Sequence, residues 1–219
     1  MKKITMIIAS LFIFLTGCED YLDVNKNVDA PDHVEGYLYL AGIQQSYLGV
    51  YYEIRGLGPM TQMMGTTALY YTNFANHYYA QGNDACGEIW RMTYWNQGMN
   101  LENMINQSLA AEEWTLAGIG YAIKAYSWDM LAKEHAELPM KQAFVDGLLS
   151  HDYDYQKDVY KQVREWAYKA IELLEKEDNK DYGTKISAND FIYQGNKAKW
   201  IKFAYAVLVR NLASLSNKT

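Results

Sequence analysis

The clearest structural signal in the sequence lies at residues 154–174, DYQKDVYKQVREWAYKAIELL. Apolar residues recur there at the spacing of one helix face, while lysines and glutamates four residues apart occupy the opposite face. Asp154 is placed to cap the first turn. The segment therefore predicts an amphipathic helix that packs along one stripe. The predicted stripe is Val159, Val163, Trp166, Ala167, Ala170, Ile171 and Leu174, and the predicted solvent face is Lys161, Glu165, Lys169, Glu172 and Lys176.

Helical spacing extends over most of the remaining chain, and no run predicts a strand. We expect Asp32 to cap the first helix, residues 56–59 to break it, and a polar loop over 177–189. Small residues of the 114–133 segment would let a neighbouring helix approach closely. Because the connections are short, successive helices are expected to pair antiparallel in an all-α fold. The further predicted helices are 31–53, 60–69, 87–112, 114–133 and 198–216.

Tryptophan and methionine are expected mainly in the core. Met60, Met63 and Met64 are predicted to fill core space, because methionine adapts to irregular gaps. Cys86 is predicted to be a small buried residue. The tryptophans lie at helical spacing, which is more typical of packing than of a binding site. They are Trp90, Trp95, Trp114, Trp128, Trp166 and Trp200.

The N-terminus is typical of a leader followed by a lipid attachment site. Lys2 and Lys3 precede an apolar run over 4–15, which is too short for the ~30 Å hydrocarbon core and fits a secretory signal. Leu15-Thr16-Gly17-Cys18 matches the lipobox of bacterial lipoproteins, so Cys18 is expected to carry fatty chains such as palmitate that anchor the protein in a membrane. An ordinary cleaved signal is the alternative, as is a short buried helix. The predicted organisation is a signal peptide at 1–17, a lipidated tether at 18–30 and a helical domain at 31–219.

The composition excludes several functional classes. A formal net charge of −6 argues against nucleic acid as a partner, and the balance of apolar and charged residues is that of a globular protein. The histidines lack metal-ligand spacing, and no phosphate loop, nucleophile elbow or dinucleotide fingerprint occurs. Glu112 and Glu113 are adjacent and would point apart on a helix, unlike the carboxylate pair of a glycosidase. We therefore expect no enzyme activity, no metal and no cofactor.

Several short motifs resemble a single family. They are YLDVN at 21–25, AYSW at 125–128 with LP at 138–139 and AF at 143–144, YDYQ at 153–156 before VY at 159–160, and DFIYQGN at 190–196 with KWIKFA at 199–204. Together they resemble the SusD/RagB-like lipoproteins of Bacteroidetes, in particular the starch-binding-associated branch. The resemblance extends over 18–219, and its last pair of motifs is the most specific.

The resemblance implies both a fold and a role. SusD-like proteins are helical, with tetratricopeptide-like antiparallel pairs, and are lipid-anchored at the cell surface on the outer membrane. They cap a SusC-like TonB-dependent transporter and capture glycans or other nutrients. Their length is roughly twice that of this chain, which therefore corresponds to a truncated, N-terminal part of the family fold. The family's Asp-x-Tyr-Gly-Asp-Ile-Pro segment is here Lys133–Pro139, and Ala136 replaces a glycine that tolerates positive φ.

The segment 68–84, ALYYTNFANHYYAQGND, is predicted to be a long aromatic loop with a binding role. Flat aromatic faces stack on sugars, and amides hydrogen-bond to hydroxyls. In the family, aromatics from N-terminal loops contribute to glycan binding. The alternative is that these tyrosines pack on the transporter or on the helical core. The predicted carbohydrate-binding residues are Tyr70, Tyr71, Asn73, Asn76, Tyr78 and Tyr79, with Arg55 as a further helper.

The sequence thus favours a non-enzymatic lipoprotein that binds glycans and delivers them to the transporter. One alternative is a lipid-anchored enzyme that cleaves glycosides on an all-helical scaffold. The lack of a convergent carboxylate motif disfavours this enzyme. The other alternative is a truncated remnant that scaffolds without binding a ligand.

Overall fold

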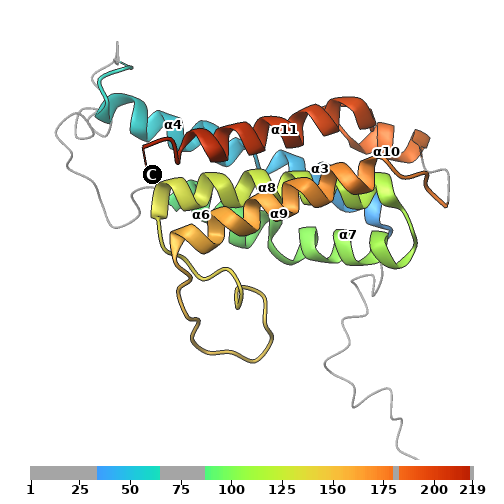
Figure 1. The fold of residues 1–219 in the computed structure, drawn as a ribbon, viewed down its shortest axis with the longest axis horizontal. Helices are drawn as coiled ribbons and strands as arrows, with labels where there is room; N and C mark the ends of the chain where they lie inside the picture. Colours follow the sequence, from blue (N-terminus) through green and yellow to red (C-terminus); the bar gives the residue numbers. More distant parts are fainter. Residues whose placement is uncertain (1–33, 65–86, 180–182, 218–219) are drawn as a thin grey trace, which may run out of the picture. The chain divides into compact units, whose positions relative to one another are not determined.

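The computed structural model describes residues 34–64, 87–179 and 183–217, which form a helical structure (Figure 1). The predicted signal peptide, the lipid tether with Cys18, the aromatic loop and Cys86 lie outside these residues. In the described segments the β pairing is one isolated bridge, Leu138 to Asp154. The predicted all-α class is confirmed. The elements are α3 (Gly36–Gln45), α4 (Leu48–Met60), α6 (Gly87–Trp90), the π-helical η1 (Arg91–Gln97), α7 (Gly98–Ala110), α8 (Trp114–His135), α9 (Gln156–Leu174), α10 (Gly183–Asn189) and α11 (Lys197–Ala213).

Helices α8, α9 and α11 run alongside one another (Figure 1). Leu138 and Asp154 exchange both backbone hydrogen bonds, at 2.9 and 3.3 Å, where α8 has ended and α9 is about to begin. At the other end, the Lys176 ammonium lies 4.9 Å from the Trp114 ring centroid, so α8 and α9 are antiparallel. Lys197, at the start of α11, donates to the Lys176 carbonyl at 2.6 Å, so α11 is antiparallel to α9. The predicted antiparallel pairing is confirmed for these helices.

The amphipathic prediction for α9 is confirmed, but its predicted cap is wrong. Most of the predicted stripe is buried, and Trp166 is half-buried. The N-cap position belongs to Tyr155, which makes no side-chain capping hydrogen bond. Asp154 instead accepts hydrogen bonds from the backbone N–H groups of Met140 and Lys141, at 3.0 and 2.9 Å. Its carboxylate therefore holds the segment after α8 instead of the start of α9.

The predicted helix 31–53 is wrong in its boundaries. It divides into α3 and α4 at Ser46, whose hydroxyl donates to the Ile43 carbonyl at 2.5 Å and draws the chain out of the helix. Helix α4 then continues through the predicted break at 56–59, with Pro59 in its last turn. Pro59 removes one backbone donor there, and Thr61 closes the helix end by donating its hydroxyl to the Leu57 carbonyl at 3.1 Å.

Two further local predictions are wrong. In the predicted helix 60–69, the described residues 61–64 form a turn and bend after the end of α4, and 65–69 lie outside the described residues. Met63 and Met64 are exposed instead of filling the core. The predicted loop 177–189 contains α10, because Ile186 buries its side chain against the core. The core prediction for most tryptophans is confirmed: Trp128 and Trp200 are buried, and Trp90 and Trp166 pack against the core.

The close approach predicted for the 114–133 helix is confirmed at two glycines of α8. A Cβ atom on Gly118 would lie 2.6 Å from Cγ of Leu174 in α9. A Cβ atom on Gly120 would lie 2.6 Å from Cγ1 of Ile105 in α7. Glycine at these positions therefore lets α8 contact both neighbours at short range. In the segments that the structure describes, none of the helices combines the length and apolarity required to cross a membrane.

Ala136 ends α8 in a backbone conformation that favours glycine, with φ 60° and ψ −98°. Replacing Ala136 with Gly is expected to raise the free energy of unfolding by about 1 kcal/mol, because glycine adopts this conformation without steric strain. Urea denaturation followed by circular dichroism measures the change. Ala206→Gly, at an exposed position inside α11, is the matched control and should lower stability by about 1 kcal/mol. Equal destabilisation by both variants would contradict strain at Ala136.

Candidate functional site

The side chains of the carbohydrate-binding residues predicted from the sequence lie outside the described part of the structure. Tyr70, Tyr71, Asn73, Asn76, Tyr78 and Tyr79 lie outside the described residues. Arg55 belongs to α4, but its side chain is also outside the described part. All seven therefore stay predictions.

An aromatic groove runs along η1, α7, α8 and α9 and is bordered by the segment that follows α8. It consists of two hollows, of about 400 and 440 Å³, which share Met99 and Phe144. We call this pair of hollows the aromatic groove. Its aromatic lining is Trp90, Tyr94, Trp95, Trp128, Phe144 and Trp166. Its amide and charged lining includes Arg91, Asn100, Glu102, Asn106, Lys124 and Gln162.

Most of the aromatic rings of the groove form a continuous series. The Tyr94 ring centroid lies 4.6 Å from that of Trp90 and 5.3 Å from that of Trp128, and Trp128 lies 6.0 Å from Trp166. Phe144 joins at 6.4 Å from Tyr94. These separations are typical of aromatic packing and make this part of the lining rigid. Trp95 stands apart, with 79% of its surface exposed.

Tyr94 fastens the helical side of the groove to the segment after α8. Its hydroxyl donates to the Pro139 carbonyl at 2.6 Å. Burial raises the pKa of Tyr94 far above its ordinary value, and the electrostatic interactions with Tyr153 and Asp154 add to this shift. The hydroxyl is therefore protonated at neutral pH and can act as a hydrogen-bond donor.

Asp154 fixes the opposite wall of the groove. Besides two backbone N–H groups, it binds the Lys141 ammonium at 2.8 Å. Burial raises the pKa of Asp154, but the hydrogen bonds from Lys141 and from the Met140 backbone outweigh that effect, so the pKa lies below its ordinary value of 3.8. Gln142 and Asp152 add a pair of hydrogen bonds of 2.8 and 3.1 Å across the base of the same loop. The wall is thus held by charge-assisted contacts.

The charges that line the groove are paired with opposite charges. Lys124 lies 2.5 Å from Glu102, and its ammonium is 4.5 Å from the Trp166 ring centroid. Lys141 is paired with Asp154, and Arg91 lies 2.7 Å from Glu88. By contrast, the side-chain amides of Asn100, Asn106 and Gln162 make no hydrogen bond to any residue that the structure describes. The groove therefore offers flat rings and free amides without a net local charge.

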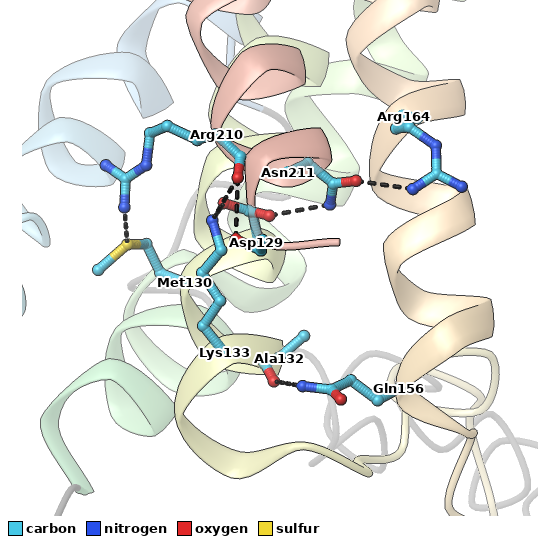
Figure 2. Close-up of polar contacts among 9 residues, drawn as sticks. Asp129, Met130, Ala132, Lys133, Gln156, Arg164, Arg210 and Asn211 are labelled. Carbon is cyan, nitrogen blue, oxygen red and sulfur yellow. Dashed lines mark hydrogen bonds and ion pairs between the residues drawn. The ribbon is translucent and has the colours of Figure 1, made fainter. Parts of the chain in front are cut away.

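A second polar cluster ties three helices together and is structural in character (Figure 2). Asp129 of α8 is buried, accepts from the Asn211 amide at 2.9 Å and lies 2.5 Å from the Lys133 ammonium. Asn211 of α11 in turn accepts from the Arg164 guanidinium of α9 at 2.7 Å. Figure 2 shows Arg210 turned away from Asp129 toward the Met130 sulfur, at 3.0 Å. Because these side chains satisfy one another, the cluster holds α8, α9 and α11 in register.

A third polar centre surrounds Asp190, which is buried at the end of α10. Its carboxylate accepts hydrogen bonds of 2.7 Å from the Gln44 amide, the Trp200 indole and the Gly195 backbone. It also accepts from the backbone of Ile192 at 3.0 Å. This carboxylate organises the turn that the DFIYQGN motif encodes, so the most specific family-like motif has a structural role. Among the described residues, no cluster of histidine, cysteine, aspartate or glutamate could hold a metal ion.

Most tryptophans are expected in the core from their helical spacing, and the sequence does not predict that the groove residues meet. Trp95, Trp128 and Trp166 come from three helices, so their proximity depends on tertiary packing. Trp95 also lies in the π-helical segment that begins directly after Trp90, where the wider turn shifts the face that each residue occupies. The amphipathic spacing used for the prediction assumes a regular α-helix. The sequence feature that could have indicated the groove is the concentration of aromatic residues between 90 and 95.

Comparisons with known proteins agree with the helical fold. Residues 45–219 match the model of a SusD-like family described as starch-binding and associating with the outer membrane. A SusD/RagB family protein from Bacteroides thetaiotaomicron is similar in structure, with a TM-score of 0.67 and 21% identity over 85% of this chain and 39% of its own. A SusD homologue from Bacteroides fragilis gives a TM-score of 0.62 and 21% identity over 84% and 37%. None of the curated proteins matches the sequence. The chain thus spans about two fifths of the length of these solved structures.

Proposed function

This chain belongs to the SusD-like family, and from that premise we propose that it is a cell-surface lipoprotein that binds glycans and delivers them to a SusC-like TonB-dependent transporter. The observation that carries the proposal is the family match over 45–219, whose description combines starch binding with the outer membrane. The helical fold, similar to that of two SusD-like proteins, supports it. The role proposed is capture of a nutrient before transport.

The N-terminal sequence supports attachment to the membrane. Leu15-Thr16-Gly17-Cys18 would direct acylation to Cys18, and a residue with two or three fatty chains is a stable anchor. The tether over 18–30 would then hold the helical domain outside the cell. A glycan would bind first to this domain and pass from it to the transporter.

The proposed role is binding without catalysis. In the aromatic groove, Glu102 is ion-paired with Lys124 at 2.5 Å, and Asp154 is engaged by Lys141 and two backbone donors. Neither carboxylate is held as one of a facing pair across an open cleft, which glycoside cleavage requires. For ligand contact we propose the loop residues Tyr70, Tyr71, Asn73, Asn76, Tyr78 and Tyr79, with Arg55 as a helper.

Acylation at Cys18 gives the direct test of the proposed location. The full chain, expressed in a Bacteroidetes host with labelled palmitate, is expected to carry the label and to fractionate with the outer membrane. It is also expected to co-purify with a TonB-dependent transporter. Cys18→Ala should lose the label completely and leave the membrane fraction, because the thiol that accepts the lipid is gone. Label that persists in Cys18→Ala would contradict the proposal.

A further inference from the structure

The outer face of α11 is apolar and basic, and it is open to solvent in the described part of the chain. We infer that this face docks an amphipathic helix of a partner protein, which carries acidic residues along one flank. The inference goes beyond glycan capture, because α11 lines neither hollow of the aromatic groove. The outer face consists of the exposed residues Ala198, Lys202, Tyr205, Ala206, Val209, Leu212 and Ala213.

Helix α11 has two apolar sides. Its inner side, which includes Trp200 and Val207, is buried, and α11 lies against α8 and α9 (Figure 1). On the outer face, Tyr205, Val209 and Leu212 are 52, 66 and 51% exposed. They follow one another at intervals of four and three residues, which is the spacing of a seam between two packed helices. A helix that is apolar on two sides is typical of a buried position, and the described residues cover one of these sides.

Helix α9 shows what a solvent-facing side looks like in the same protein. Its exposed side carries the pairs Lys161–Glu165, at 3.8 Å, and Lys169–Glu172, at 3.0 Å, beside the ring of Tyr168. Opposite charges three and four residues apart are typical of a helix surface that stays in water. Because α11 contains no acidic residue, its outer face cannot form such pairs within the helix. Its composition is that of a contact surface.

Cations without a carboxylate partner border the outer face, although the chain has a formal net charge of −6. Lys199 and Lys202 are exposed, and neither forms an ion pair with a residue that the structure describes. Arg210 contacts the Met130 sulfur at 3.0 Å and the Tyr126 ring at 5.6 Å from its centroid. Lys199 and Arg210 lie about three helical turns apart on the same edge of the face. Aspartate or glutamate along one flank of a docked helix would pair with these cations, so the charge pattern favours an acidic partner.

The same charges disfavour the other occupants of an exposed helix face. Two copies of the chain packed through this face would add their cations to one interface without a carboxylate from either α11, which opposes association. An anionic lipid surface would attract the cations, but it extends beneath the whole molecule and would meet a net charge of −6. A partner helix covers the outer face alone and meets its local positive charge.

A designed peptide of three heptads tests the docking surface on the full chain. The peptide is stapled so that it stays helical and monomeric, with leucine and valine on one side and glutamate along the flanks. Fluorescence polarisation of the labelled peptide is expected to give a Kd on the order of 10 µM. The same peptide with lysine in place of glutamate should bind at least about tenfold more weakly. Equal binding of the two peptides, or no binding of the glutamate peptide, would overturn the inference.

Substitutions on α11 separate the apolar contribution from the charged one. Val209→Glu should weaken binding of the glutamate peptide at least about tenfold, because it places a carboxylate inside the seam. Lys199→Glu combined with Lys202→Glu should reverse the preference, so that the lysine peptide binds more tightly. Lys161→Glu, on the charged side of α9, is the matched control and should bind as wild type. Because these positions are exposed, the circular dichroism spectrum should be unchanged in each variant.

The other occupants give results that contradict the inference. If the full chain dimerises in sedimentation velocity and Val209→Glu makes it monomeric, the outer face is an interface between copies. If the unacylated Cys18→Ala chain floats with phosphatidylcholine–phosphatidylglycerol vesicles and the same chain with Val209→Glu does not, the face binds lipid. Both measurements are independent of sugars, so either result would sink the docking of an acidic helix and leave glycan capture standing.

Discussion

Replacing Asp190 with Ala is expected to lower the free energy of unfolding by about 3 kcal/mol, because two buried side-chain donors lose their acceptor. The Gln44 amide and the Trp200 indole both donate to this carboxylate at 2.7 Å, and Asp190 itself is only 1% exposed. The change also releases the Gly195 backbone N–H, which shapes the turn before α11. Urea denaturation measures the loss. Asp146→Ala, at an exposed acid of the loop after α8, should change stability by less than about 0.5 kcal/mol.

The same carboxylate makes stability depend on pH in a defined direction. Burial raises the pKa of Asp190, but the hydrogen bonds from Trp200, Gly195, Gln44 and Tyr193 outweigh this effect and hold it below the ordinary value of 3.8. Its contribution is therefore complete above pH 3.8 and is lost as the pH falls through the lower folded-state value. Wild type and Asp190→Ala should converge in stability in that acid range. A gap between them that stays constant down to pH 2 would contradict this role.

The long amphipathic helices could be predicted because their evidence is local. The stripes of α9 and α11 repeat over several turns, so one misplaced residue does not change the result. The division between α3 and α4 was missed because it depends on one serine hydroxyl turning back to the Ile43 carbonyl. Asp154 was misread for a related reason. An acid before a helix satisfies the local rule for a cap, but this one meets stronger partners at Met140 and Lys141, which approach only after the chain has folded back.

The candidate site was less predictable than the fold, because it is assembled from segments far apart in the chain. Phe144 contributes from the loop after α8, Trp166 from α9 and Trp95 from η1. Helical spacing does not distinguish the tryptophans from one another, since each lies at a position typical of core packing. Only tertiary packing distinguishes Trp128, which is buried, from Trp95, which faces solvent. Residue spacing identifies the faces of a helix, but it does not indicate whether the next element covers that face.

The contact between α8 and α9 is sensitive to a single methyl group. A Cβ atom on Gly118 would lie 2.6 Å from Cγ of Leu174 and 3.1 Å from the Ala170 carbonyl oxygen. Gly118→Ala is therefore expected to lower the free energy of unfolding by about 1–2 kcal/mol, because overpacking outweighs the gain in helix propensity. Leu174 can change rotamer, but the Ala170 backbone moves only if the two helices separate. Denaturation in urea measures the difference.

Gly42 is the matched control, because it lies inside α3 and a Cβ atom there would meet nothing within 4 Å. Gly42→Ala is expected to raise the free energy of unfolding by about 0.5–1 kcal/mol, since only the propensity gain remains. The same substitution should thus have opposite signs at the two positions. If Gly118→Ala also stabilised the protein, α8 and α9 could not be packed as closely as the Gly118 contacts require. The groove residues on these two helices would then lie at different positions relative to one another.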